Sequence, residues 1–148
     1  MINYGMPKEL IPKMREHIAN NKGFWLTVTG NSMNPTFAHL RDKVYISPFY
    51  GNAKKGDILL TVVNGNHCLL HRVIRCEGDM IYYKGDAQNF CEGPYSCSDV
   101  IGIVTKAERK GKIFIVNNSL FRLVSFMDRK KQRVKRKIIN VAHKIKKR

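Results

Sequence analysis

Short runs of β-branched and aromatic residues between residues 24 and 116 constrain the fold of this chain more than any other feature. The runs lie at 24–28, 43–47, 57–63, 68–75, 80–84, 100–106 and 112–116. Turn signals such as Asn-Pro, Glu-Gly-Asp and Gly-Pro separate them, and Asn64-Gly65 is a strong hairpin signal. Because no helical pattern of useful length intervenes, we predict a mainly β protein, a small antiparallel β-fold closed over on itself.

A short helix is predicted before the strands, over residues 7–22. Its apolar residues fall on one helical face: Leu10, Ile11, Met14 and Ile18. Pro12 suits the first turn of a helix, so we expect the helix to begin near it. The chain then divides into three parts, which are an N-terminal helical extension, a β-domain and a C-terminal helix, at 1–23, 24–118 and 119–148.

The C-terminal part, residues 119–148, is predicted to be a basic amphipathic helix. Its apolar residues recur at spacings of three and four, interrupted only at Lys131: Leu120, Val124, Met127, Val134, Ile138, Val141 and Ile145. This part holds 12 of the 27 lysine and arginine residues and a single acid, Asp128, so it contributes +11 of the net charge of +16. The body of the chain is therefore only mildly basic.

Four uses of this basic helix are open. It would lie on an anionic membrane with its apolar face down, each basic residue contributing about 1 kcal/mol near the surface. It would pack on a partner protein through its heptad-like seam, or cover its own β-domain with its apolar face. Binding to nucleic acid is the least favoured, because no aromatic interleaving or nucleic-acid motif accompanies the charge. We favour the membrane surface.

One turn carries a serine that is a candidate nucleophile. Ser32 follows Gly30 and precedes Pro35 at the end of an apolar run, a setting that exposes both its hydroxyl and its backbone N–H. A serine nucleophile needs a base and donors for an oxyanion, and a turn serine alone shows neither. Downstream, His71 lies on a predicted strand and Asp86 follows another in a Gly-Asp turn. Serine, histidine and aspartate thus occur in order at strands or strand ends.

Five boxes around these residues resemble the signal peptidase I family in its endoplasmic-reticulum and archaeal form. They are Gly30-Asn31-Ser32-Met33-Asn34-Pro35-Thr36, Asp42-Lys43-Val44-Tyr45-Ile46, Lys55-Gly56-Asp57-Ile58-Leu59, His71-Arg72-Val73-Ile74 and Lys84-Gly85-Asp86. A last run, Val100–Val104, resembles the closing Val-x-Gly strand of that family. The similarity covers roughly residues 24–105, and five boxes in order make it specific.

The resemblance implies a serine endopeptidase with Ser32, His71 and Asp86 as catalytic residues. Ser32 attacks the scissile carbonyl, His71 takes its proton, and Asp86 holds the imidazole. The Ser32 backbone N–H is the implied oxyanion donor. Bacterial signal peptidases and self-cleaving repressor proteases use a lysine where this chain has His71, which implies the histidine branch. Activity should then fall in acid, where imidazole is protonated and cannot act as a base.

The resemblance also implies how a polypeptide substrate binds. An extended peptide would pair with a sheet edge beside the serine, with small residues before the cut. The expected edge is Leu26–Gly30, and the expected substrate-binding residues are Leu26, Val28, Gly30 and Met33. The substrate class is a leader or signal-like peptide.

A non-catalytic module is the competing class, in which a protease-like fold serves only to bind peptide or membrane. The presence of Ser32, His71 and Asp86 together favours the enzyme, because a decayed site would tolerate their loss. We expect no cofactor. Four cysteines, Cys68, Cys76, Cys91 and Cys97, form no Cys-x-x-Cys pair, so we expect no metal and predict free thiols.

The sequence departs from typical signal peptidases, which transmembrane helices tether to the membrane. No stretch approaches the roughly 20 apolar residues of a membrane span. The first residues lack the charged-then-apolar order of an export signal. We therefore expect a variant without transmembrane helices that stays in the cytoplasm, peripheral to the membrane surface where residues 119–148 bind lipid.

Overall fold

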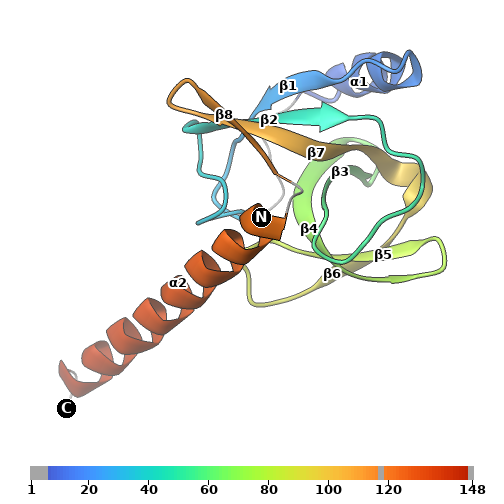
Figure 1. The fold of residues 1–148 in the computed structure, drawn as a ribbon. Helices are drawn as coiled ribbons and strands as arrows, with labels where there is room; N and C mark the ends of the chain where they lie inside the picture. Colours follow the sequence, from blue (N-terminus) through green and yellow to red (C-terminus); the bar gives the residue numbers. More distant parts are fainter. Residues whose placement is uncertain (1–6, 117–118, 147–148) are drawn as a thin grey trace.

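A computed structural model describes residues 7–116 and 119–146, in which eight antiparallel strands form one sheet with a helix near each end (Figure 1). The helices are α1 (Leu10–Ala19) and α2 (Ser119–Lys146). The strands are β1 (Phe24–Thr27), β2 (Asp42–Ser47), β3 (Ile58–Val63), β4 (His67–Glu77), β5 (Met80–Lys84), β6 (Glu92–Ser96), β7 (Val100–Arg109) and β8 (Lys112–Ile115). The predicted fold class is confirmed.

The sheet folds over on itself and encloses the core. Its strand order is β1-β2-β7-β3-β4-β5-β6, and β8 pairs with β7. Figure 1 shows β1, β2 and β7 on one side and the β5–β6 pair on the other. The long strands β4 and β7 flank β3 at the centre.

Strand β3 is the centre of the core and is buried at every position. Ile58, Leu60 and Val62 pack into one apolar cluster, while Leu59 and Val63 pack into a second on the other face. A continuous apolar run suits a strand that is covered on both faces.

Strand β6 is the one described strand that the sequence pattern did not predict. Gly93 and Pro94 were interpreted as a turn signal, but both lie within the strand. Among the described residues β6 pairs only with β5, and a proline is tolerated on such an edge strand because no ladder hydrogen bond needs its missing N–H. This strand begins at Glu92, a residue of the candidate active site.

Helix α1 is shorter than predicted and begins at Leu10, two residues before Pro12. Pro12 therefore lies in the first turn, where its missing N–H is not needed. Ile11 and Met14 are buried against the core and Ile18 packs beside them.

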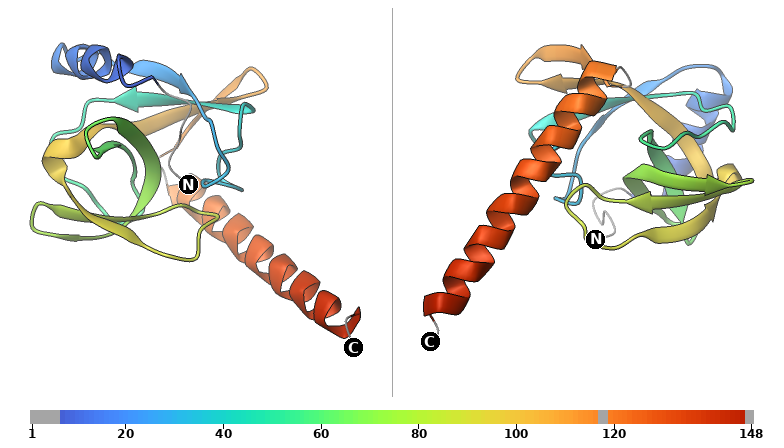
Figure 2. Two further views of the ribbon diagram at one scale, coloured as in Figure 1. Left: turned by 180° about the vertical axis from the view of Figure 1, so that it is seen from behind. Right: turned by 60° about the horizontal axis from the view of Figure 1, so that its bottom comes forward.

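Helix α2 packs on the sheet near its beginning and then extends away from it (Figure 2). The ring of Phe121 stacks on Phe37 and Phe114, with centroid distances of 6.1 and 6.0 Å. Ser125 is buried, and Arg122 and Arg136 each donate a hydrogen bond to the β-domain. The predicted end of the helix, 147–148, and the Leu120 side chain lie outside the described residues.

The apolar side of α2 faces away from the domain. Its packed residues recur at helical spacing, as do its exposed apolar ones, and at about 100° per residue the two sets lie on opposite faces. The packed set is Phe121, Arg122, Ser125, Asp128, Arg129, Gln132 and Arg136. The exposed stripe on the opposite face is Leu123, Val124, Met127, Val134, Ile138, Val141 and Ile145. Phe126 and Ile139 are also exposed but lie outside this stripe. The reading in which the apolar face covers the β-domain is therefore wrong.

Candidate active site

The turn that carries Ser32 joins β1 to β2 and is fixed from several sides. Gly30 has a φ of +84°, which favours glycine, and its N–H donates to His39 Nδ1 at 2.9 Å. Met33 and Phe37 are buried in the core and anchor the turn. The Ser32 carbonyl accepts from the Ala87 N–H at 2.8 Å. The Ser32 side chain is held in place while remaining half-buried.

His71 lies directly beside this serine. Its Nε2 atom is 2.9 Å from Ser32 Oγ, within hydrogen-bonding distance. His71 lies on β4 opposite Leu59 of β3 and is only 1% exposed. The central strands of the sheet thus hold the imidazole in a buried position. A general base must lie within hydrogen-bonding distance of the hydroxyl whose proton it takes, and this position meets that requirement.

Glu92, at the start of β6, binds the other side of the imidazole. Its Oε2 atom lies 2.7 Å from His71 Nδ1. The hydrogen bond with His71 lowers the pKa of Glu92, and burial opposes this only in part. An ionised carboxylate accepts the Nδ1–H, which leaves Nε2 as the nitrogen that can take a proton from Ser32.

Asp86 does not occupy the position that the resemblance assigned to it. Its two carboxylate oxygens accept from Arg72 Nε and Nη2, both at 2.8 Å, and the Thr36 hydroxyl also donates to it. The cause is strand geometry, because Arg72 follows His71 on β4 and successive side chains point to opposite faces. Asp86 is therefore on the face away from the imidazole, and the expected contact with His71 is wrong.

Asp86 nevertheless lies close to Ser32 through its loop. The next residue, Ala87, donates the hydrogen bond to the Ser32 carbonyl. A Cβ atom on Gly85 would come within 2.6 Å of the same carbonyl oxygen, so the two segments are in tight contact. The Arg72–Asp86 pair thus supports the turn that presents Ser32.

The expected substrate edge is the outer edge of β1, which pairs only with β2 within the described part of the chain. The Val28 N–H donates to Asp42 and its carbonyl accepts from Leu40, so its backbone points inward. Since backbone direction alternates along a strand, Trp25 and Thr27 direct their N–H and C=O groups to the outer edge. The structure thus turns the backbone of Leu26 and Val28 away from the position where a peptide would pair.

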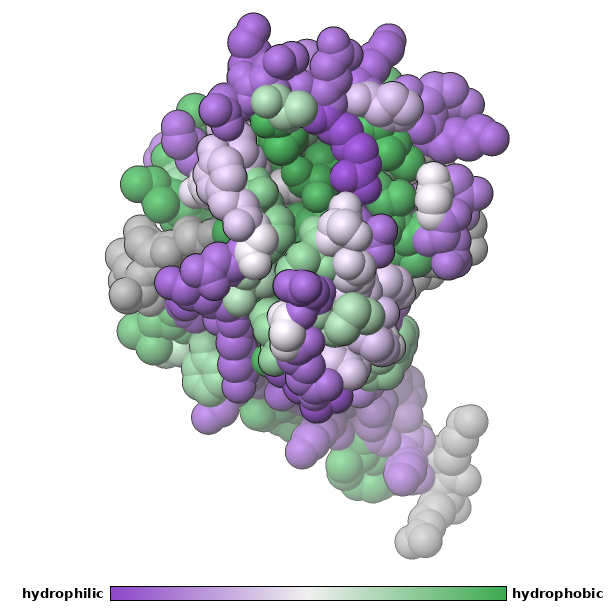
Figure 3. All heavy atoms as spheres, turned by 90° about the vertical axis from the view of Figure 1, so that its right-hand side faces the viewer, coloured by the Kyte–Doolittle hydropathy of each residue, from purple (hydrophilic) through white to green (hydrophobic). Residues whose placement is uncertain are grey.

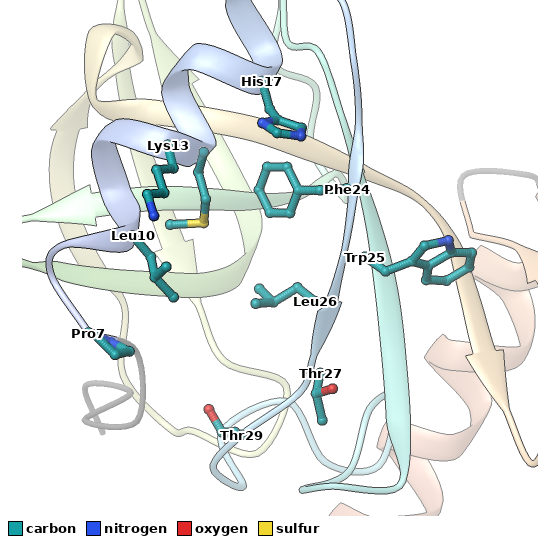
Figure 4. A pocket seen from close by; sticks show the side chains of 10 residues that line it. Pro7, Leu10, Lys13, His17, Phe24, Trp25, Leu26, Thr27 and Thr29 are labelled. Atoms are coloured by element: carbon teal, nitrogen blue, oxygen red, sulfur yellow. The ribbon is translucent and has the colours of Figure 1, made fainter.

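The predicted substrate-binding residues lie along two adjoining cavities. Val28, Gly30 and Met33 line a very small cavity of about 10 Å³ beside Ser32 and His71. Leu26 lines a larger apolar groove of about 390 Å³ between α1 and β1. Figure 4 shows Leu10, Phe24 and Leu26 facing one another across this groove. Thr29 lines both cavities.

Among the described residues, no group of three or more His, Cys, Asp or Glu side chains is arranged to hold a metal ion. All four cysteines are free thiols in the structure. No helix in the described part of the chain is both long enough and apolar enough to cross a membrane.

The antiparallel β-fold is that of a serine-peptidase-like protein. The family model described as Peptidase S24-like matches residues 3–105. This match spans more than half of the chain, and the protein belongs to the Peptidase S24-like family. The match also supports the wider superfamily that joins S24-like and signal-peptidase-like proteins, to which the sequence boxes pointed. No curated protein matches the chain.

Proposed function

We propose that the protein is a serine endopeptidase in which Ser32 is the nucleophile, His71 the base and Glu92 the residue that orients the base. The observation that carries this proposal is the continuous hydrogen-bonded series from Ser32 Oγ to His71 Nε2, at 2.9 Å, and from His71 Nδ1 to Glu92 Oε2, at 2.7 Å. Nucleophile, base and orienting carboxylate are the three parts of the Ser-His-carboxylate arrangement of serine proteases.

The reaction follows from these positions. Ser32 Oγ forms a bond to the scissile carbonyl carbon while its proton passes to His71 Nε2. His71 then returns this proton to the leaving amine, and Glu92 stabilises the imidazolium formed between the two steps. The backbone N–H of Ser32 donates to no acceptor among the described residues, so it is available to the oxyanion.

The substrate we propose is a leader or signal-like peptide with a small residue before the cut. The cavity beside Ser32, about 10 Å³, favours a small side chain. The apolar groove between α1 and β1 suits larger apolar side chains further from the cut. A peptide paired with the outward backbone of Trp25 and Thr27 would place alternate side chains toward these two cavities.

We place the enzyme in the histidine branch that resembles endoplasmic-reticulum and archaeal signal peptidases. The support is His71 itself, which occupies the position of the base where the other branches have lysine. In this proposal Asp86 is a positioning residue that acts through Ala87 and the Ser32 carbonyl.

We propose that the outward face of α2 contacts an anionic membrane surface. Ile138 and Ile145 are 63% and 69% exposed on this face. Figure 3 shows hydrophobic side chains at the surface beside hydrophilic ones toward the far end of α2. An apolar stripe flanked by lysine and arginine is typical of helices that lie in the headgroup region.

Mapping of new protein N-termini in cells tests the proposed activity. Cells that express wild-type protein should contain N-termini that are absent from cells with Ser32→Ala, and the uncut precursors should accumulate in the latter. The residue before each new N-terminus should be small. Identical N-termini in both cell lines would contradict the proposal.

A further inference from the structure

A third cavity, of about 570 Å³, lies between α2 and the β-domain on the packed side of the helix. Its wall comes from four parts of the chain: the β2–β3 loop, β4, the segment after β5, and α2. The active-site hydroxyl and imidazole do not line it. It is therefore separate from the site described above.

The wall of this cavity is strongly cationic. Seven basic side chains line it: Lys55, Arg72, Lys84, Arg122, Arg129, Lys130 and Arg133. Among the described residues that line the wall, the one acid is Asp86, and Asp57 pairs with Arg122 at 2.9 Å. No carboxylate of the described residues forms an ion pair with Lys55, Lys84, Lys130 or Arg133.

Arg129 shows that the pairing of this charge within the described residues is incomplete. Its side chain is 18% exposed, and its ion pair with Asp86 is long, with Arg129 Nη1 3.7 Å from Asp86 Oδ2. That carboxylate already binds Arg72 with two hydrogen bonds of 2.8 Å. Arg129 Nη1 and Arg122 Nε are buried atoms without a hydrogen-bond partner in the described structure. Burial, followed by the charge of Arg72, lowers the pKa of Arg129.

Cations gathered on one cavity wall repel one another, and a partly buried cation such as Arg129 destabilises the fold unless an anion pairs with it. Guanidinium groups match phosphate oxygens in bidentate geometry, and lysines add point charges to the same anion. The volume exceeds what a single small anion needs, and the cations lie on several walls. Both observations favour an anion with several charged groups in close succession.

We propose that this cavity binds an anion with clustered phosphate groups, which bridges α2 to the Lys84–Asp86 segment. The bound anion would accept hydrogen bonds from Arg129 Nη1 and Arg122 Nε, the buried arginine atoms without a partner in the described structure. It would also hold the segment that is followed by Ala87, the donor to the Ser32 carbonyl.

Calorimetric titration of the full chain with sodium tripolyphosphate at constant ionic strength tests the site. The double variant Lys130→Ala, Arg133→Ala removes two exposed charges from the cavity wall. The matched control, Lys137→Ala, Lys144→Ala, removes two exposed charges from the same helix outside the cavity. We expect saturable binding to wild type, weakened by about tenfold or more in the first variant and by about twofold or less in the control.

Absence of saturable binding to wild type, or equal weakening in both variants, would overturn the proposal. A second arm separates a soluble ligand from a lipid headgroup that carries the same chemistry. It uses phosphatidylcholine vesicles with phosphatidylinositol bisphosphate. If wild-type protein pellets with these vesicles and tripolyphosphate releases it, and if Lys130→Ala, Arg133→Ala no longer pellets, the ligand is the lipid headgroup. Binding of tripolyphosphate without such pelleting assigns it to a soluble anion.

Discussion

His71 and Arg72 are neighbours on β4, yet each binds its own carboxylate on opposite faces of the strand. His71 meets Glu92 at 2.7 Å, while Arg72 meets Asp86 with two bonds of 2.8 Å. The two carboxylates therefore have different proposed roles. Glu92 orients the His71 imidazole, and Asp86 stabilises the turn that carries Ser32.

This division predicts different effects for Glu92→Gln and Asp86→Asn. Glu92→Gln removes the charge that stabilises the imidazolium, so we expect kcat to fall by about 10²-fold or more with little change in stability. Asp86→Asn leaves Arg72 buried without its partner, so we expect about 3 kcal/mol lower free energy of unfolding. Cleavage rates and urea unfolding of both variants check this. A larger loss of kcat in folded Asp86→Asn than in Glu92→Gln would reverse the assignment.

Gly85→Ala should reduce activity through the nucleophile turn. The added Cβ atom would lie 2.6 Å from the Ser32 carbonyl oxygen, so the turn must move. A displacement of this order costs about 10²-fold in rate. Gly65→Ala is the control, because Gly65 has a φ of +72° and open space around it. The control should lose about 1 kcal/mol of stability and keep its kcat. Equal kcat in the two variants would contradict the tight contact.

Much of the fold could be predicted from the sequence because strand runs and turn signals are local. Ile58–Val63 is an apolar run, and Asn64-Gly65 marks the hairpin after it. The strand that begins at Glu92 was not predicted because Gly93-Pro94 has the composition of a turn. A sheet tolerates such a proline only in an edge strand. The missed strand carries the missed residue of the site.

The incorrect assignment of Asp86 has a different cause. Ser32 and His71 were predicted, and the structure brings them together. The sequence places His71 and Arg72 next to each other on a strand, so their side chains point to opposite faces and one carboxylate cannot bind both. Which carboxylate meets which side chain depends on long-range pairing that no local pattern encodes. The packed face of α2 escaped prediction for a similar reason, since arginine contacts with the domain decide it.

Asp42 should make the protein sensitive to acid. Burial alone would raise its pKa, but hydrogen bonds from Arg109, Arg41 and the Ala38 N–H lower it from 3.8 to about 2. The folded pKa lies below the unfolded one, so its contribution, about 2 kcal/mol, is complete above pH 3.8 and is lost as the pH falls toward 2. Urea unfolding across this pH range should show that the difference in free energy of unfolding between wild type and Asp42→Asn becomes smaller as the pH falls. A difference that stays constant with pH would contradict this prediction.

The outward stripe of α2 should decide membrane binding without any change of net charge. Ile138→Gln, Ile145→Gln keeps the charge and removes exposed apolar area, so we expect much less pelleting with phosphatidylserine-containing liposomes. Asn140→Gln, an exposed position on the same helix, is the control and should pellet like wild type. The membrane proposal fails where all three proteins pellet equally or none does.

The role of Ser32 as the nucleophile is tested by incubating a peptide library with purified wild-type protein and with Ser32→Ala, prepared in parallel, and following cleavage by mass spectrometry. We expect fragments from the wild type, cut after small residues, and a rate lower by about 10³-fold or more in the variant. Circular dichroism should show both proteins equally folded. The same fragments at the same rate from both proteins, or none from either, would contradict a serine endopeptidase built on Ser32 and His71.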